Sequence, residues 1–116
     1  MIAADVAERN MLQDAVILEY VQRRNVVNWT EFKESFERDR AYIRERLCHL
    51  ADERHVSHST GPDGYSESTE TWSIAPAGYA RIEELKGLLG DNYERIIRTW
   101  KKERASSRAQ EISGNL

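Results

Sequence analysis

A helix that runs directly into a strand is the feature that most limits how this chain can fold. Residues 39–56 read DRAYIRERLCHLADERHV. Within this segment Ile43, Leu47 and Leu50 recur at four- and three-residue spacing, so they share one face of a helix and can be buried together. The segment therefore predicts a helix over residues 39–53 and, directly after it, a short strand.

The side chains off this apolar face are mostly basic or aromatic: Arg40, Tyr42, Arg44, Arg46 and His49. A short helix with a buried apolar seam and outward Arg, Tyr and His side chains has the features that reading a DNA major groove requires. The alternative interpretation is a solvated face with internal ion pairs. Arg40 and Arg44 carry like charges at four-residue spacing, which is unfavourable for internal pairing, so we favour contact with DNA.

A second short helix is predicted directly before this one. Asn28 and Glu31 have the spacing of a capping box, and the helix that they begin ends near Glu37. Its core-facing side chains are aromatic: Trp29, Phe32 and Phe36. Asp39 can cap the following helix by accepting hydrogen bonds from its free backbone N–H groups. Only a tight turn fits between the two helices, so the sequence predicts a helix-turn-helix.

A β-hairpin and a further helix are predicted beyond residue 55. Strands over 56–60 and 69–74 flank the turn signal Gly61-Pro62-Asp63-Gly64, which begins a long hairpin loop. Pro76 suits the first turn of a helix, and Gly90 is expected to end that helix. The predicted fold class is mainly α with a small β-hairpin.

The two ends of the chain are expected to differ. Residues 1–9 are predicted to be an N-terminal arm before a helix over 10–24, and 26–27 a short extended piece. A last helix is predicted over 91–108, followed by a flexible tail at 109–116. The last helix carries a narrow apolar stripe at the spacing i, i+3, i+4 and i+7: Tyr93, Ile96, Ile97 and Trp100. This stripe can fold back on its own domain or pair with a second copy, and we favour dimerisation.

Charge and composition limit the class of protein. The formal net charge is −3, which is unfavourable for a nucleic-acid binder, but residues 38–49 sum to +2 and residues 91–108 to +3. Local charge decides where a polyanion can dock. The single cysteine, Cys48, cannot form an internal disulfide. The first residues do not resemble a signal peptide, and no apolar run is long enough to cross a membrane. We expect a cytoplasmic protein.

The predicted order of elements resembles the winged helix-turn-helix of MarR- and PadR-like transcriptional regulators and of small archaeal or phage repressors. Residues 39–56 resemble their recognition helix and first wing strand. Residues 72–85, WSIAPAGYARIEEL, are similar to the segment where the second wing strand leads into the next helix. The resemblance covers residues 11–89. It implies a homodimer that binds a specific double-stranded DNA sequence with residues 39–53 in the major groove.

The resemblance also implies site residues. Base and phosphate contacts fall on Arg40, Ala41, Tyr42, Arg44 and Glu45, with His49 toward the DNA backbone. We add Arg38, which begins the basic segment, and Tyr65, which has no evident core role at the wing tip.

Two positions and one segment depart from the family pattern. Arg54 stands where the family often has glycine, so the turn after the recognition helix must close differently. Ala75 replaces the usual Thr or Ser cap before Pro76, which loses about 1 kcal/mol of capping. Residues 55–71 contain no Lys or Arg, although wings normally insert such a residue into the minor groove.

Other functions find less support. A group that could hold a metal lacks paired ligand spacing: Cys48, His49, Asp52, His55 and His58. A lone cysteine is usually a small buried filler, and the aromatic residues Trp29, Phe32, Phe36, Trp72 and Tyr79 are expected in the core. No catalytic motif is present, so we expect neither an enzyme nor a cofactor. The sequence does not indicate whether a small-molecule effector exists.

The sequence therefore predicts a winged-helix DNA-binding domain over residues 10–90 and a dimerisation helix over 91–108. The predicted function is that of a homodimeric transcriptional repressor. The alternative is a winged-helix module that binds a protein partner through its acidic wing and does not bind DNA. The basic-free wing and the negative net charge both motivate this alternative.

Overall fold

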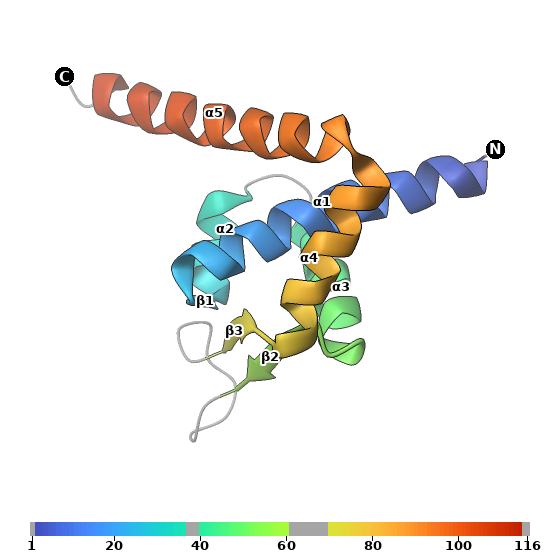
Figure 1. The fold of residues 1–116 in the computed structure, drawn as a ribbon. Coiled ribbons are helices and arrows are strands. Elements are labelled where there is room, and N and C mark those ends of the chain that lie inside the picture. Colours follow the sequence, from blue (N-terminus) through green and yellow to red (C-terminus); the bar gives the residue numbers. More distant parts are fainter. Residues whose placement is uncertain (1, 37–39, 61–69, 115–116) are drawn as a thin grey trace.

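The computed structural model describes residues 2–36, 40–60 and 70–114, and the side chains of 6–36, 40–60 and 70–103 (Figure 1). Along these residues lie α1 (Ile2–Arg24), β1 (Val26–Asn28), α2 (Trp29–Ser35), α3 (Arg40–Asp52), β2 (Val56–Ser59), β3 (Thr71–Ile74), α4 (Pro76–Leu89) and α5 (Asp91–Gly114). The fold is mainly helical with a small antiparallel sheet, as the sequence predicted. No helix among the described residues is long and apolar enough to span a membrane.

The sheet has one strand more than the predicted hairpin. Its order is β1-β3-β2, and both pairings are antiparallel. Val27 of β1 lies opposite Trp72 of β3, and His58 of β2 lies opposite the same tryptophan from the other side. The extended piece that precedes α2 therefore joins the base of the wing to the helix-turn-helix.

The predicted helix starts are confirmed at α2 and α4. The Glu31 backbone N–H donates to Asn28 Oδ1 (2.8 Å) and the Asn28 N–H donates to Glu31 Oε1 (3.2 Å), which completes the capping box. Pro76 is in the first turn of α4, and Ala75 caps that helix without a side-chain hydrogen bond. α2 ends at Ser35, two residues before the predicted end near Glu37, and Phe36 is its C-cap. The predicted cap at Asp39 lies outside the described residues.

The turn after α3 shows how the chain closes without the glycine of the family pattern. Arg54 adopts a positive φ of 62°, a conformation that costs roughly 1–2 kcal/mol for a residue with a Cβ. The His55 N–H donates to the Leu50 carbonyl (2.8 Å) and the Arg54 N–H to the Ala51 carbonyl (3.0 Å), which satisfies the last carbonyls of the helix. Gly78 of α4 packs onto this turn so closely that a Cβ would lie 2.1 Å from the His55 oxygen.

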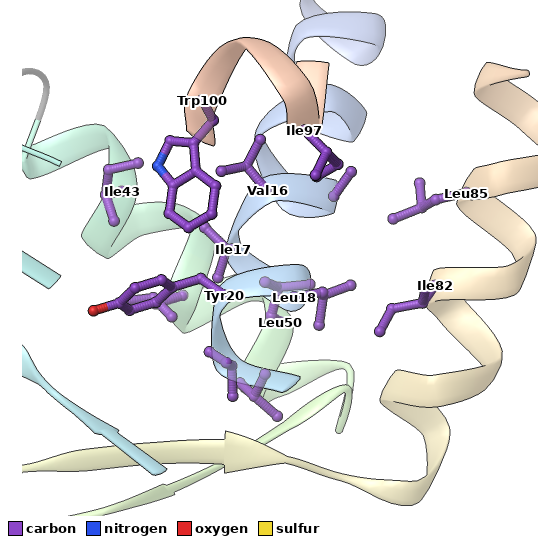
Figure 2. Close-up of a cluster of buried hydrophobic side chains, with 14 of the residues drawn as sticks. Val16, Ile17, Leu18, Tyr20, Ile43, Leu50, Ile82, Leu85, Ile97 and Trp100 are labelled. Carbon is purple, nitrogen blue, oxygen red and sulfur yellow. The ribbon is translucent and has the colours of Figure 1, made fainter. Parts of the chain in front are cut away.

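The core is organised around α1. Figure 2 shows its buried side chains with those of α4 on one side and those of α3 and α5 on the others. The fully buried positions of α1 include Ala15, Ile17, Leu18 and Val21. Tyr79 was expected in this core, but it is half exposed. It lies about a quarter turn around α4 from the buried face that Gly78, Ile82 and Leu85 form.

Both ends are more helical than the sequence analysis expected. α1 begins at Ile2, so most of the predicted arm at 1–9 is helix, and the predicted helix start at residue 10 is an interior position. α5 continues to Gly114, through most of the predicted tail at 109–116. Residues 1–9 contain three Ala together with Glu8 and Arg9, and residues 109–111 are Ala-Gln-Glu. All of these residue types are strong helix formers.

Candidate DNA-binding surface

The outward face of α3 differs from the row of basic and aromatic residues that the sequence indicated. The exposed side chains of this helix are Arg40, Ala41, Glu45, Cys48, His49 and Asp52. Four of the expected contact residues, Arg40, Ala41, Glu45 and His49, are thus on the exposed surface. Tyr42, Arg44 and Arg46 are partly covered because each interacts with another element of the fold.

Arg46 and Tyr42 are held by α1. The Arg46 guanidinium donates to both carboxylate oxygens of Asp14, from Nε at 2.8 Å and from Nη2 at 2.7 Å. The Asp14 side chain is 3% exposed and that of Arg46 11%, so this ion pair is in the interior. The Tyr42 hydroxyl donates to Asn10 Oδ1 at 2.6 Å, and the Arg9 guanidinium lies 4.4 Å from the Tyr42 ring centroid. These contacts fix α3 on α1.

Arg44 is held at the base of the wing. Its guanidinium donates to both oxygens of Glu70, at 3.1 and 2.5 Å. The guanidinium carbon lies 4.9 Å from the ring centroid of Trp29 and 5.6 Å from that of Trp72, within the range of cation–π attraction. Arg44 therefore links α2, α3 and β3 at a single point.

His58 completes this group, which we call the wing-root cluster: Trp29, Arg44, His58, Glu70 and Trp72. The His58 ring stacks on that of Trp72 with centroids 4.9 Å apart, and its Nε2 lies 2.9 Å from Glu70 Oε1. Glu70 is 2% exposed. Burial alone would raise the pKa of Glu70, but the hydrogen bonds from Arg44 and His58 outweigh it and lower that pKa below 4.5.

Sequence reasoning overlooked the two buried acids that hold these arginines, although a signal for each is present. Asp14 precedes Ile17 and Leu18 by three and four residues, so it shares the buried face of α1. Glu70 lies two residues before Trp72, and alternate residues of an extended segment point to the same side. An acid on a core-facing position needs a cationic partner, and the outward-looking arginines of residues 39–53 were the available candidates.

The remaining candidate residues are two expected DNA contacts, the single cysteine and the possible metal ligands. Arg38 and Tyr65 lie outside the described residues. Cys48 is exposed on α3, whereas a small buried filler was expected. Among the residues that the structure describes, no group of three or more His, Cys, Asp or Glu side chains could hold a metal ion.

Three of the four expected dimerisation residues are buried within their own chain. Tyr93, Ile97 and Trp100 are 5, 6 and 8% exposed, because α5 lies across α1 (Figure 1). The Tyr93 hydroxyl donates to Glu19 of α1 at 2.9 Å. Burial of the phenol raises the pKa of Tyr93, and the hydrogen bond to the Glu19 carboxylate raises it further.

Trp100 extends the aromatic contacts of the core. Its ring packs edge-on against Tyr20 at 5.5 Å and stacks on Phe36 at 5.7 Å. Figure 2 shows Trp100 above Tyr20, pointing into the domain. Tyr93, Ile97 and Trp100 therefore fold back on their own domain, which is the alternative that the sequence left open.

Ile96 is the member of the stripe that remains partly accessible. With residues of α1 it lines a groove of about 320 Å³ between the two helices. The α1 residues of this groove are Glu8, Arg9, Leu12, Gln13 and Val16. Val6, two residues before Glu8, is half exposed.

The chain is similar in structure to known proteins, but no match was found from its sequence. No family model and no curated protein matches the chain. A mutant MarR from E. coli, solved in complex with operator DNA, matches with a TM-score of 0.55 at 12% identity, covering 99% of this chain and 91% of that one. Wild-type E. coli MarR matches with a TM-score of 0.53 at 12% identity, over 99% and 93% of the two chains. ZitR from Lactococcus lactis, a mutant in its apo form, matches with a TM-score of 0.51 at 15% identity, over 98% and 74%.

These matches extend over nearly the whole of this chain, so they include α1 and α5 as well as the helix-turn-helix and the wing. The resemblance to MarR-like proteins that residues 39–56 and 72–85 indicated is thus found in the structure. The chain has the winged helix-turn-helix fold of MarR-type regulators.

Proposed function

We propose that this chain is a sequence-specific double-stranded DNA-binding transcription regulator that reads the major groove with the exposed face of α3. The observation that carries the proposal is the exposed position of Arg40, Ala41, Glu45 and His49 on the second helix of a winged helix-turn-helix. A MarR structure with this fold was solved with operator DNA. Side chains of these types make hydrogen bonds and apolar contacts with base edges and phosphates.

Within this proposal Arg44 positions the reading surface. Its guanidinium is bound to the buried Glu70 and lies over two tryptophan rings, so moving it onto DNA would leave a buried carboxylate with His58 alone. Arg40 has an exposed side chain at the start of α3 and, among the described residues, no carboxylate within ion-pair distance. Arg40 is therefore the described residue of α3 on which we place the main contact with DNA.

The first experiment is selection from a random-sequence duplex library with the purified protein at moderate salt. Enrichment of one sequence supports the proposal, and an inverted repeat supports a dimer with half-sites about one helical turn apart. Arg40→Ala should then weaken binding to the selected site with a loss of about 1–3 kcal/mol. Arg23→Ala, which removes one exposed positive charge from the end of α1, is the matched control and should bind as the unmodified protein does.

We propose further that the chain acts as a homodimeric repressor whose copies associate through the groove between α1 and α5. The groove joins partly buried apolar side chains, Leu12 and Ile96, to the half-exposed Val6 nearby. Association would bury this surface, and two copies would present two α3 helices to an inverted repeat. Occupancy of a promoter site by such a dimer would block transcription.

Light scattering after size-exclusion chromatography tests the dimer. Ile96→Asp should give a monomer that remains folded, because Ile96 is only partly buried in its own chain. Leu88→Asp, which places the same charge at an exposed leucine of α4, is the control and should leave the dimer intact. A monomeric unmodified protein, or dimers in both variants, would contradict the proposed interface.

A second candidate function is a winged-helix module that binds a protein partner. One observation favours it: the exposed face of α3 carries Glu45 and Asp52, while Arg44 and Arg46 are paired with buried acids. The library selection separates the two candidates, since a folded protein that enriches no sequence would support the interaction module.

A further inference from the structure

The four basic side chains on the described part of α5 form a surface that makes no hydrogen bond, ion pair or ring contact with the other described side chains. Arg95, Arg98 and Lys102 recur at three and four residues, so they share one face of the helix, and Lys101 lies beside them. All four are exposed. They span about 10 Å along the helix, at 1.5 Å per residue. We call these four residues the α5 basic face.

Most of the described Lys and Arg side chains outside α5 are paired with an acid, whereas the α5 basic face is not. Six basic side chains elsewhere each have a carboxylate within 4.0 Å: Arg23, Arg24, Arg44, Arg46, Arg81 and Lys86. Within the part of the chain that the structure describes, none of the four residues of the α5 basic face has such a partner. The acids Asp91 and Glu94 lie in the first turn of α5, where the helix dipole favours negative charge.

The opposite side of α5 explains why this face stays outward. Tyr93, Ile97 and Trp100 are buried against the domain, which fixes the rotation of the helix about its axis. Like charges three and four residues apart repel one another, so internal stability does not account for their grouping. An external polyanion would relieve this repulsion.

We propose that the α5 basic face binds the sugar–phosphate backbone of double-stranded DNA, independently of α3. A duplex carries about one negative charge per 1.7 Å of its axis, which suits several cations spaced along one helix. A membrane surface fits less well, because a helix that binds lipid needs an exposed apolar face, and three of the four residues of the apolar stripe of α5 are buried in the domain. The exposed residues beside the basic face are polar or acidic: Asp91, Glu94, Thr99 and Glu103.

The position of α5 makes this contact separate from the proposed reading by α3. α5 lies on the side of α1 away from the sheet (Figure 1). The α5 basic face therefore points away from the wing, and the proposal does not require that α3 recognise a sequence. It extends the proposed function by a second, sequence-independent contact with DNA.

Two variants of equal charge test the proposal. The first is Arg95→Gln/Arg98→Gln/Lys101→Gln/Lys102→Gln, which keeps good helix formers on α5. The second is Arg23→Gln/Arg24→Gln/Arg81→Gln/Lys86→Gln, which neutralises four cations that are paired in the structure. Each variant changes the formal net charge from −3 to −7, so total charge is matched. Circular dichroism would first check that both variants are folded.

The measurement is affinity for a fluorescent duplex of random sequence over a series of salt concentrations. In the α5 variant, we expect the slope of log affinity against log salt to become shallower by up to about 3.6, since each of the four lost phosphate contacts contributes roughly 0.9. The matched variant should change the slope by less than about 1. Equal slopes in the two variants, or an unmodified protein that binds no duplex, would overturn the proposal.

Two further results keep this proposal distinct from the proposed function. Arg40→Ala should weaken binding to a selected site while leaving the random duplex almost unaffected. Failure of the library selection would remove the α3 proposal alone, since the salt series uses a random duplex. Binding to phosphatidylserine vesicles that depends on the four α5 cations, with no effect of those cations on the duplex, would show that the face recognises lipid and would overturn the DNA assignment.

Discussion

α3 and α5 both carry several arginines, but the two helices use them in opposite ways. On α3, Arg44 and Arg46 turn back to buried carboxylates of other elements, and their guanidinium groups stabilise the fold. On α5, Arg95 and Arg98 extend from the surface with no carboxylate within ion-pair distance among the described residues. The number of basic residues on a helix therefore does not show which of them can bind a polyanion. That depends on acids supplied by distant parts of the chain.

The largest effect should come from breaking the pair between α1 and α3. Arg46→Met keeps most of the side-chain volume but leaves Asp14 as an unpaired buried charge, which costs about 3–5 kcal/mol. Urea denaturation measures the loss in free energy of unfolding. Arg23→Met, which breaks an exposed pair with Glu19, is the control and should cost less than about 1 kcal/mol. Equal losses in the two variants would mean that Asp14 is solvated in solution.

The wing-root cluster should tolerate the loss of its arginine somewhat better. Arg44→Met leaves Glu70 with His58, and about a third of the Arg44 side chain is in contact with water, so we expect a cost of about 2 kcal/mol. Arg44→Met/Glu70→Gln removes the charge that is left unpaired, and it should recover part of this loss in the same urea experiment. A double variant less stable than the single one would contradict this account.

The same cluster predicts how stability depends on acid. The pKa of Glu70 is lower in the folded chain than 4.5, so its ionised form stabilises the fold above about pH 4.5, and this contribution is lost as the pH falls through the lower, folded-state pKa. Between about pH 6 and pH 3, the free energy of unfolding should fall more steeply for the unmodified protein than for Glu70→Gln. Parallel curves would show that Glu70 does not contribute to acid sensitivity.

The contrast between the helices also separates what the sequence could predict from what it could not. Local signals placed α2, α3 and α4 well: the Asn28–Glu31 capping box, the Ile43–Leu47–Leu50 stripe and Pro76 all act within one or two helical turns. The partners of the α3 arginines could not be found in this way. Asp14 lies 32 residues before Arg46, and Glu70 lies 26 residues after Arg44, so these contacts exist only once the tertiary fold is formed.

The helix ends and the apolar stripe on α5 show a second limit of prediction from local sequence patterns. Ala-rich and charged segments have helix propensity but no strong periodicity, so the start of α1 at Ile2 was not evident from pattern alone. The stripe of Tyr93, Ile97 and Trp100 was recognised as a burial surface, but periodicity does not say which surface it meets. Trp100 packs against Tyr20 and Phe36 of the same chain, and Ile96 is the part of the stripe that remains partly accessible.

The smallest effect on stability is expected from removing the charges of the α5 basic face. Because no carboxylate of the described residues pairs with these cations, replacing all four by glutamine removes no ion pair. Relief of like-charge repulsion, at about 0.2–0.5 kcal/mol per pair, should leave the free energy of unfolding equal or slightly higher. If urea denaturation showed a loss above about 1 kcal/mol, the cations would be stabilising the fold as Arg46 does, and the distinction between inward and outward arginines would fail for α5.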